Sequence, residues 1–197
     1  MNKLYATWDK PNVLFSRTFN CGYCGNSIAS NMGYNAKSST SYNNNGYIYI
    51  CHHCNNPTYF HNNIQFPGAI YGESVTDVPE LESNLYNEAR SCISCNAYTA
   101  AVLCCRKLLM NIAVSRGAKE GLKFIQYVEY LAQGGFIPPD AKEWVDHIRK
   151  KGNEATHEIA IMTKQDAEDL IDFVEMLLKI IYTFPATIKK KTKTESA

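Results

Sequence analysis

Two pairs of cysteines are the residues whose type and spacing point most clearly to a chemical role. Cys21 and Cys24 form one C-x2-C pair, Cys51 and Cys54 form a second, and 26 residues separate the pairs. A C-x2-C turn lets both thiolates face one ion, and two such turns complete a tetrahedral zinc site that leaves no position for water. The sequence therefore predicts one structural Zn²⁺ ion held by these four cysteines.

Two alternatives compete with this metal site. A pair of disulfides would need an oxidising compartment, and the first ten residues contain charge but no apolar run of the kind that directs secretion. His52, His53 or His61 could replace a cysteine as a ligand, although four thiolates already satisfy the ion. The remaining cysteines, at Cys92, Cys95, Cys104 and Cys105, lack paired turns and are predicted to pack in a core.

A second candidate site lies in residues 140–161. Pro138 and Pro139 precede a pattern in which Ala141, Trp144 and Ile148 recur at helical spacing, so a helix is predicted from Asp140 to Lys151. Gly152 is expected to end it, because glycine accepts the left-handed cap conformation. Asn153 and His157 then follow on a turn, where they either bond exposed backbone groups or face a ligand.

The residues from Arg149 through Gly152 and Asn153 to His157 resemble the R-x-x-G-N-x-x-x-H signature of a prokaryotic domain-of-unknown-function family. That family occurs free-standing, in phage genomes and fused to type I restriction subunits, and it is similar to the HEPN superfamily of dimerising helical domains. Many HEPN proteins are metal-independent endoribonucleases with an R-x(4 to 6)-H motif. The resemblance extends over about residues 79–185, including Arg106 on an earlier helix, and implies a homodimer.

Two functions from different classes follow. Aligning the motif puts Gly152 where the catalytic arginine would stand, and this favours a non-catalytic module that binds RNA, DNA or a protein partner, in phage defence or restriction. The alternative is a HEPN-type endoribonuclease in which His157 is the general acid or base. Arg149 or Lys150 would then stabilise the phosphate charge, and Asn153 would position the substrate.

The elements that must hold these residues differ between the two halves of the chain. Strands are expected over Val13 to Phe19 and Gly46 to Ile50, each leading into a cysteine pair, and residues 26–45 are expected to be a projecting loop because they are rich in Asn, Ser and Gly. Nearby aromatic and basic residues either make a platform that stacks single-stranded nucleic acid or, for the aromatics, cover a ribbon too small to have a core. These residues are Arg17, Tyr23, Tyr34, Lys37, Tyr42, Tyr59 and Phe60.

From Glu80 onward the apolar pattern is helical. About five helices are predicted, the last opening at Thr163 in a capping box with Asp166 and ending at Pro185. The fold class is therefore α+β: a small β zinc ribbon (1–66), a linker (67–79), an all-α HEPN-like bundle (80–185) and a basic, disordered tail (186–197).

Charge and hydropathy bound the partners. Residues 1–66 hold four Lys or Arg and one Asp, whereas residues 67–188 hold 12 basic and 17 acidic residues, a net charge of −5. Nucleic-acid contacts must therefore be local, because non-specific binding requires many cations. No uninterrupted apolar stretch reaches membrane-spanning length, so the sequence predicts a cytoplasmic protein without a membrane partner.

Overall fold

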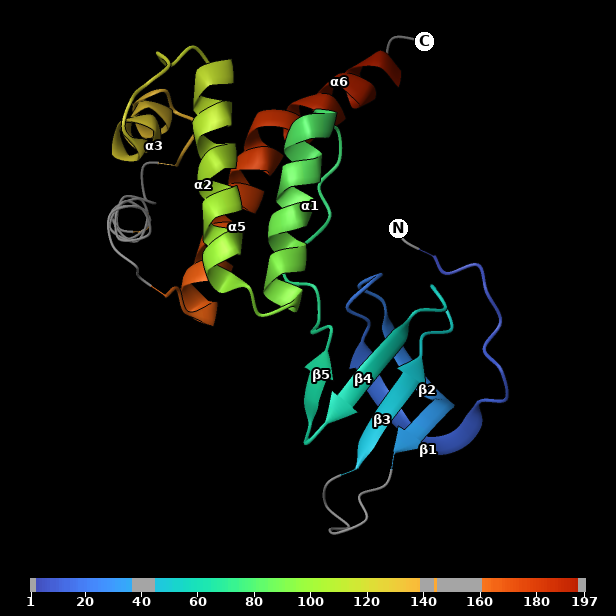
Figure 1. Cartoon of the computed structure of the whole chain (residues 1–197). Coiled ribbons are helices and arrows are strands. Elements are labelled where there is room, and N and C mark those ends of the chain that lie inside the picture. The colour runs from blue at the N-terminus through green and yellow to red at the C-terminus, as the bar shows by residue number, and fades with distance from the viewer. Residues whose placement is uncertain (1–2, 37–44, 139–143, 145–160, 195–197) are drawn as a thin grey trace. The chain divides into compact units, whose positions relative to one another are not determined.

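A computed structural model describes residues 3–36, 45–138, 144 and 161–194 (Figure 1). The chain forms two compact units: Met1–Ile70 with Ser94–Asn96, and Tyr71–Ile93 with Ala97–Ala197. The first is built on a β-sheet and the second on helices, so the protein is of mixed α+β class, as predicted.

The N-terminal unit is a five-stranded antiparallel sheet with strand order β1-β2-β3-β4-β5. Its strands are β1 (Asn12–Asn20), β2 (Ser27–Ala36), β3 (Gly46–Ile50), β4 (Pro57–His61) and β5 (Ile64–Phe66). The strands predicted ahead of the cysteine pairs are confirmed as β1 and β3.

Strand β2 corrects the expectation of a loop over residues 26–45. Its ten residues pair with β1 on one side and β3 on the other, and Ile28, Ser30 and Gly33 are buried while most of its Asn and Ser side chains face outward. Composition alone indicated a loop, because Asn, Ser and Gly have low intrinsic strand propensity. Pairing on both edges overrides that local preference. Residues 37–44, with Lys37 and Tyr42, lie outside the described residues.

The sheet curls around a small aromatic core. Phe60 packs edge-on against Phe19 and Tyr49, with ring centroids 5.1 and 5.7 Å apart, and all three side chains are buried. A side chain of β5 also reaches the backbone of β1: Gln65 Nε2 donates to the Asn20 carbonyl oxygen at 2.7 Å. Because β1 and β5 are opposite edges of the sheet, this contact shows that the sheet bends back towards closure.

The helical unit surrounds one central helix. Its elements are α1 (Glu80–Ser94), α2 (Tyr98–Ser115), α3 (Phe124–Gln133), α5 (Lys164–Leu178), η2 (Lys179–Thr183) and α6 (Phe184–Thr194). Helix α2 packs against both α3 and α5, and Leu108, Leu109 and Ile112 are buried in the core. In the described part of the chain, α2 alone is long and apolar enough to cross a membrane, but almost half of it is buried as the core helix of this unit.

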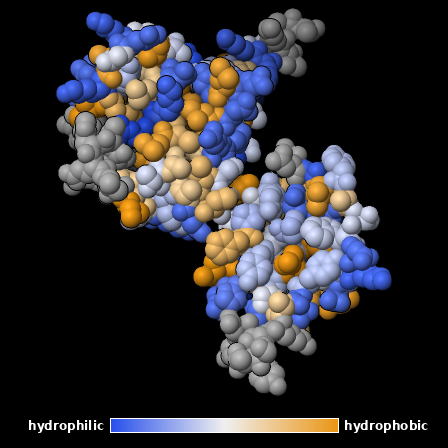
Figure 2. Space-filling model, viewed as in Figure 1, coloured by the Kyte–Doolittle hydropathy of each residue, from blue (hydrophilic) through white to orange (hydrophobic). Residues whose placement is uncertain are grey.

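Figure 2 shows hydrophobic residues gathered between α1 and α2 on the visible face of the helical unit. Cys92 of α1 and Cys104 of α2 are half-buried and pack against the core, whereas Cys105 is fully buried and Cys95 is exposed. Burial raises the pKa of the Cys104 thiol to about 11, so it stays protonated at neutral pH. Cys92, Cys104 and Cys105 thus act as small apolar side chains, as predicted, whereas the prediction is wrong for Cys95.

The described residues form four helices where the sequence predicted about five, counting α5, η2 and α6 as one continuous helix. The predicted helix from Asp140 to Lys151 lies outside the described residues, except for Trp144, whose ring packs edge-on against Phe173 with centroids 5.2 Å apart. The predicted capping box is confirmed: Thr163 accepts from the Asp166 N–H, and the Asp166 side chain accepts from the Thr163 N–H.

The last helix does not stop at Pro185, and the predicted disordered tail is wrong as far as Thr194, where α6 ends. Proline normally ends a helix because it lacks an N–H and clashes with the carbonyl of residue i−4. Here η2 is a π-helical turn in which the Phe184 N–H bonds the Lys179 carbonyl oxygen. The wider turn starts a new helical register, so Pro185 takes a first-turn position, which proline tolerates.

A partly buried carboxylate attaches the segment before α1 to helix α5. Glu175 accepts hydrogen bonds from Lys179 Nζ at 2.6 Å, the Glu73 backbone N–H at 2.7 Å and the Tyr86 hydroxyl at 3.0 Å. Burial acts to raise the pKa of Glu175, but these hydrogen bonds outweigh it and hold the pKa below its ordinary value. The ionised carboxylate is therefore the form that the folded state stabilises.

Glu175→Gln is expected to lower the free energy of unfolding of the helical unit by about 1–3 kcal/mol at neutral pH, because three donors, among them the hydroxyl of buried Tyr86, lose a charged acceptor. A lowered folded-state pKa stabilises the protein above the unfolded pKa, and this is lost as the pH falls through the folded pKa. Urea unfolding across acidic pH should thus show a shallower pH dependence in the variant. Glu168→Gln, which removes an i,i+4 ion pair with Lys164, should cost no more than about 0.5 kcal/mol. Equal losses of unfolding free energy in Glu175→Gln and Glu168→Gln would contradict the stabilising role assigned to Glu175.

Candidate metal centre

The four cysteines lie on two hairpin ends that repeat the same backbone structure. After β1, the Gly25 N–H bonds the Cys21 carbonyl oxygen at 2.8 Å; after β3, the Asn55 N–H bonds the Cys51 carbonyl oxygen at 2.7 Å. Gly25 and Asn55 both have positive φ, at 72° and 62°. Such a turn needs glycine or asparagine at this position, because other side chains rarely adopt left-handed backbone.

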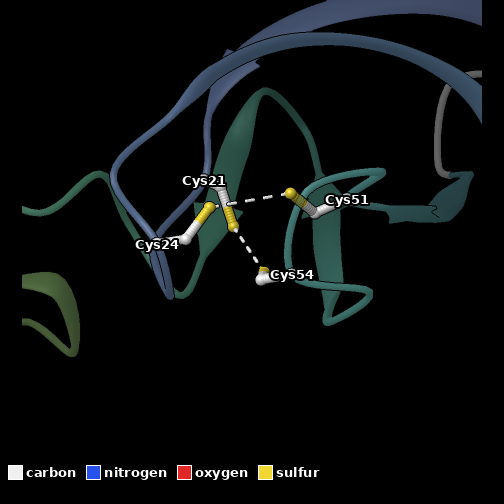
Figure 3. A group of neighbouring side chains, drawn as sticks. All are labelled: Cys21, Cys24, Cys51 and Cys54. Carbon is white, nitrogen blue, oxygen red and sulfur yellow. Dashed lines mark hydrogen bonds between the residues drawn. The ribbon is translucent and has the colours of Figure 1, made fainter. Parts of the chain in front are cut away.

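The two turns bring all four sulfurs together (Figure 3). The Sγ atoms lie within 4.8 Å of one another, with Cys21 and Cys54 3.6 Å apart and Cys24 and Cys51 3.7 Å apart. Cys21, Cys51 and Cys54 are buried and Cys24 is partly buried. Four sulfurs of a tetrahedral thiolate site, each about 2.3 Å from a zinc ion, would be separated by similar distances. The geometry therefore fits a metal ion with four thiolate ligands.

Neighbouring donors support the thiolates. The Tyr23 N–H points at Cys21 Sγ at 3.5 Å, and Asn26 Nδ2 donates to Cys24 Sγ at 3.3 Å. Burial raises the pKa of Cys21 and Cys51, while hydrogen bonds from Asn56 and the other cysteines lower the pKa of Cys54 against the effect of burial. A divalent ion must displace thiol protons when it binds, and four adjacent thiolates need its charge.

The N-terminal segment adds contacts that the sequence did not predict. The Leu4 N–H bonds the Cys54 carbonyl oxygen at 2.8 Å, and Trp8 Nε1 donates to the Asn55 carbonyl oxygen at 3.0 Å. Asn55 Nδ2 returns a hydrogen bond to the Leu4 carbonyl oxygen at 3.1 Å. Residues 4–8 thus stabilise the second cysteine turn, and no sequence motif predicts this role.

The histidines considered as alternative ligands lie outside the sulfur cluster. His52 and His53 are exposed and face each other, with ring centroids 4.7 Å apart, and His61 stacks near Tyr59. Within the described residues, the four-cysteine group is the one set of three or more metal-ligating side chains brought together. The candidate residues Arg149, Lys150, Asn153 and His157 fall outside those residues, so the predicted site at His157 stays a prediction.

Arg106, the other polar residue singled out on α2, is buried. Its guanidinium lies over the Phe124 ring at 4.3 Å, and its Nη1 has no hydrogen-bond partner. Burial lowers the pKa of Arg106 because a desolvated charge is disfavoured. Among the described residues, no acidic side chain forms an ion pair with Arg106.

The architecture defines a two-unit protein in which a cysteine-centred sheet precedes a helical domain. The family model described as "Domain of unknown function (DUF4145)" matches residues 87–196, more than half of the chain, and the protein belongs to this family. The match runs from within α1 through α6, so the family describes the helical unit and the sheet precedes it. No curated protein and no solved structure matches the chain significantly.

Proposed function

We propose that the N-terminal unit is a zinc ribbon whose ion is structural. Four thiolates are the ligand set of structural zinc sites, and they fill every position of a tetrahedral ion. Such an ion has no position left to activate water, so it acts through the fold of the two hairpins. Its chemical contribution is to hold the ends of β1 and β3 together and thereby fix the curvature of the sheet.

We further propose that this unit binds single-stranded nucleic acid on the outer face of the sheet. The observation that carries the proposal is a row of side chains crossing four strands. Tyr34 pairs with Ile48, Ile48 with Tyr59, and Tyr59 with Phe66. Paired residues point to the same face. Trp8 extends this outer-face row, since its ring lies 6.2 Å from that of Tyr34.

The outer-face row is accessible. Tyr59 is 42% exposed and Phe66 is 43% exposed, although apolar side chains of this size are normally covered. Three strand spacings of about 4.8 Å give the row a length on the order of 14 Å, enough for two or three stacked bases. Aromatic rings stack on any base, so such a surface favours single strands without strong sequence preference.

Charge favours this unit over the helical unit for a polyanion. Asp9 is the single acidic residue in residues 1–66, which also contain four basic residues. Of the other aromatics proposed from sequence, Phe60 belongs to the core and Tyr23 is 39% exposed near the metal centre, outside the outer-face row. The proposed platform thus keeps Tyr34 and Tyr59 from the set predicted from sequence and adds Trp8 and Phe66.

The resemblance noted at residues 149–157 supports a proposal for the biological role of this binding. We propose a HEPN-like helical unit that forms a homodimer and a role in phage defence or restriction, in which the helical unit assembles and the sheet contacts nucleic acid. A non-catalytic role is favoured over ribonuclease activity, because Gly152 stands at the position of the catalytic arginine and lysine lacks the planar fork of arginine.

Fluorescence anisotropy with labelled single-stranded RNA, single-stranded DNA and duplex DNA tests the binding. The zinc-loaded full chain should bind the single strands and bind the duplex more weakly. Phe66→Ala should weaken single-strand binding by about tenfold, because each stacked base contributes about 1–3 kcal/mol. Phe15→Ala is the matched control: Phe15 is 90% exposed on the same unit but lies outside the outer-face row, so its loss should change affinity by less than about twofold.

Absence of binding to every single strand by the folded, zinc-loaded protein would overturn the proposal and favour a protein partner. Incubation with tRNA and mixed RNA in magnesium-free buffer tests the enzyme alternative alongside. Cleavage that leaves cyclic phosphate ends and disappears in His157→Ala would establish a ribonuclease instead of a non-catalytic module.

A further inference from the structure

A cavity of about 420 Å³ opens where β3 begins and β4 ends in the turn to β5. Its lining includes Arg17, Tyr47, Phe60, His61, Asn62 and Asn63. The cavity is thus built from one cation, aromatic rings and amide side chains. Small-molecule sites commonly have this size and combine an apolar wall with a few convergent polar groups.

Arg17 is held in place by neutral partners. Its guanidinium carbon lies 4.2 Å from the centre of the Phe60 ring, and its Nη2 donates to Asn63 Oδ1 at 3.1 Å. Stacking on a buried ring and bonding a turn amide fix the plane of the guanidinium. Neither contact neutralises its charge, and no acidic side chain is among the residues that line the cavity.

The chemistry of this arrangement points to a phosphate. A planar guanidinium presents pairs of parallel N–H donors, which match the oxygens of a phosphate better than a single donor does. The amides of Asn62 and Asn63 stand on the same rim, and side-chain amides also donate to phosphate oxygens. A carboxylate-bearing ligand would find the same donors, but the aromatic wall at Tyr47 and Phe60 favours a ligand that also carries a flat ring.

The cavity meets the outer-face row at the end of β4, although its wall at Tyr47 and Phe60 faces the opposite side of the sheet from Ile48 and Tyr59. His61 lines the cavity and also stacks on Tyr59, with the two rings 12° from parallel and their centroids 6.3 Å apart. Tyr59 in turn pairs with Phe66 across β4 and β5. A strand whose bases stack on Tyr59 and Phe66 would reach the cavity by passing His61 and the turn at Asn62 and Asn63, around the end of β4.

We infer that this cavity binds a backbone phosphate of the single-stranded nucleic acid, with Arg17 as the residue that receives it. The inference rests on the proposed function, and it adds where the strand lies: its bases stack over β4 and β5, and one backbone phosphate lies at the turn between these strands. Arg17 then supplies the cation that the uncharged outer-face row lacks.

Single-strand affinity measured over a series of salt concentrations tests the inference. Arg17→Ala should weaken binding by about tenfold and reduce the slope of log affinity against log salt by about 0.7, the value for one phosphate of a single strand. Arg17→Lys should keep the slope but recover the affinity only in part, because lysine keeps the charge and loses the fork. Lys3→Ala removes one cation from the same unit outside the cavity and should leave both quantities nearly unchanged.

Asn63→Asp tests the same cation independently of how well the Arg17 variants fold. A carboxylate at this position can still accept from Arg17, so the turn should keep its structure, yet it cancels the cation that the phosphate needs. Zinc content should therefore stay stoichiometric while affinity falls at least as far as in Arg17→Ala. If Phe66→Ala weakens binding while Arg17→Ala and Asn63→Asp leave affinity and salt slope unchanged, the cavity is not the phosphate site and the proposed function stands. If the unmodified protein binds no single strand, both the proposed phosphate site and the proposed function are wrong.

Discussion

Replacing Cys21 or Cys51 by serine should release the metal ion and unfold the N-terminal unit. Each variant removes one of four ligands from a cluster in which all sulfurs lie within 4.8 Å. The free energy with which a structural zinc ion binds, about 10–16 kcal/mol in small zinc domains, is also folding free energy. The aromatic core of this unit is small, and net stabilities of whole domains are only about 5–15 kcal/mol, so the loss should exceed what the remaining contacts supply.

Metal analysis and hydrogen exchange on the full chain measure the two consequences separately. Zinc should fall from one ion per chain to none, and the amides of β1 to β4 should lose protection while those of α2 and α5 keep it, because the helical unit has its own core. Cys95→Ser is the matched control, since Cys95 is exposed and lies outside the sulfur cluster. Stoichiometric zinc in both Cys21→Ser and Cys51→Ser would show that these sulfurs are not ligands.

Gly33→Ala should produce the second largest loss of stability. A Cβ atom at position 33 would lie 1.8 Å from the Ile48 carbonyl oxygen and 3.2 Å from the Tyr49 Cα, both backbone atoms of β3. Backbone in a paired strand cannot turn aside as a side chain can, so β2 and β3 must separate locally. We expect a cost of at least about 3 kcal/mol, the upper part of the range for overpacking. The thermal transition of a unit this small should then fall by more than about 10 °C.

Gly46→Ala provides the comparison within the same sheet. The added Cβ would meet the Tyr59 ring at 3.1 Å, and a ring can move where a backbone carbonyl cannot. Its transition temperature should therefore fall much less than that of Gly33→Ala. Similar transition temperatures for Gly33→Ala and the unmodified protein would mean that β2 and β3 do not approach as closely as described.

The sequence predicts the parts of the N-terminal unit that depend on local pattern. Cysteine spacing identified the four sulfurs, and alternating Tyr and Ile identified β3. Strand β2 could not be found in this way, and neither could the alignment of Tyr34 and Tyr59 with the rest of the outer-face row. Tyr34, Ile48 and Phe66 are remote in sequence and become neighbours only through the register of three strand pairs, which no local pattern specifies.

Helix periodicity and capping residues predicted the helical unit to a similar extent. The capping box at Thr163 is correct, but the helix end at Pro185 is not, because a π-helical turn rearranges the backbone hydrogen bonds ahead of the proline. Glu175 was not singled out either. Its role depends on Glu73 and Tyr86, which are about 100 and 89 residues away in the chain. Contacts of this kind follow from tertiary packing rather than from any motif.

The matching turns at Cys21 and Cys51 divide the metal site equally between two hairpins. Each hairpin supplies two sulfurs and repeats the same carbonyl contact and the same left-handed residue, Gly25 in one and Asn55 in the other. One hairpin alone would leave a tetrahedral ion half-coordinated, and a second copy of the same hairpin would complete it. The site is therefore built from two equivalent halves, each supplying two of the four sulfurs, and neither hairpin alone can hold a tetrahedral ion.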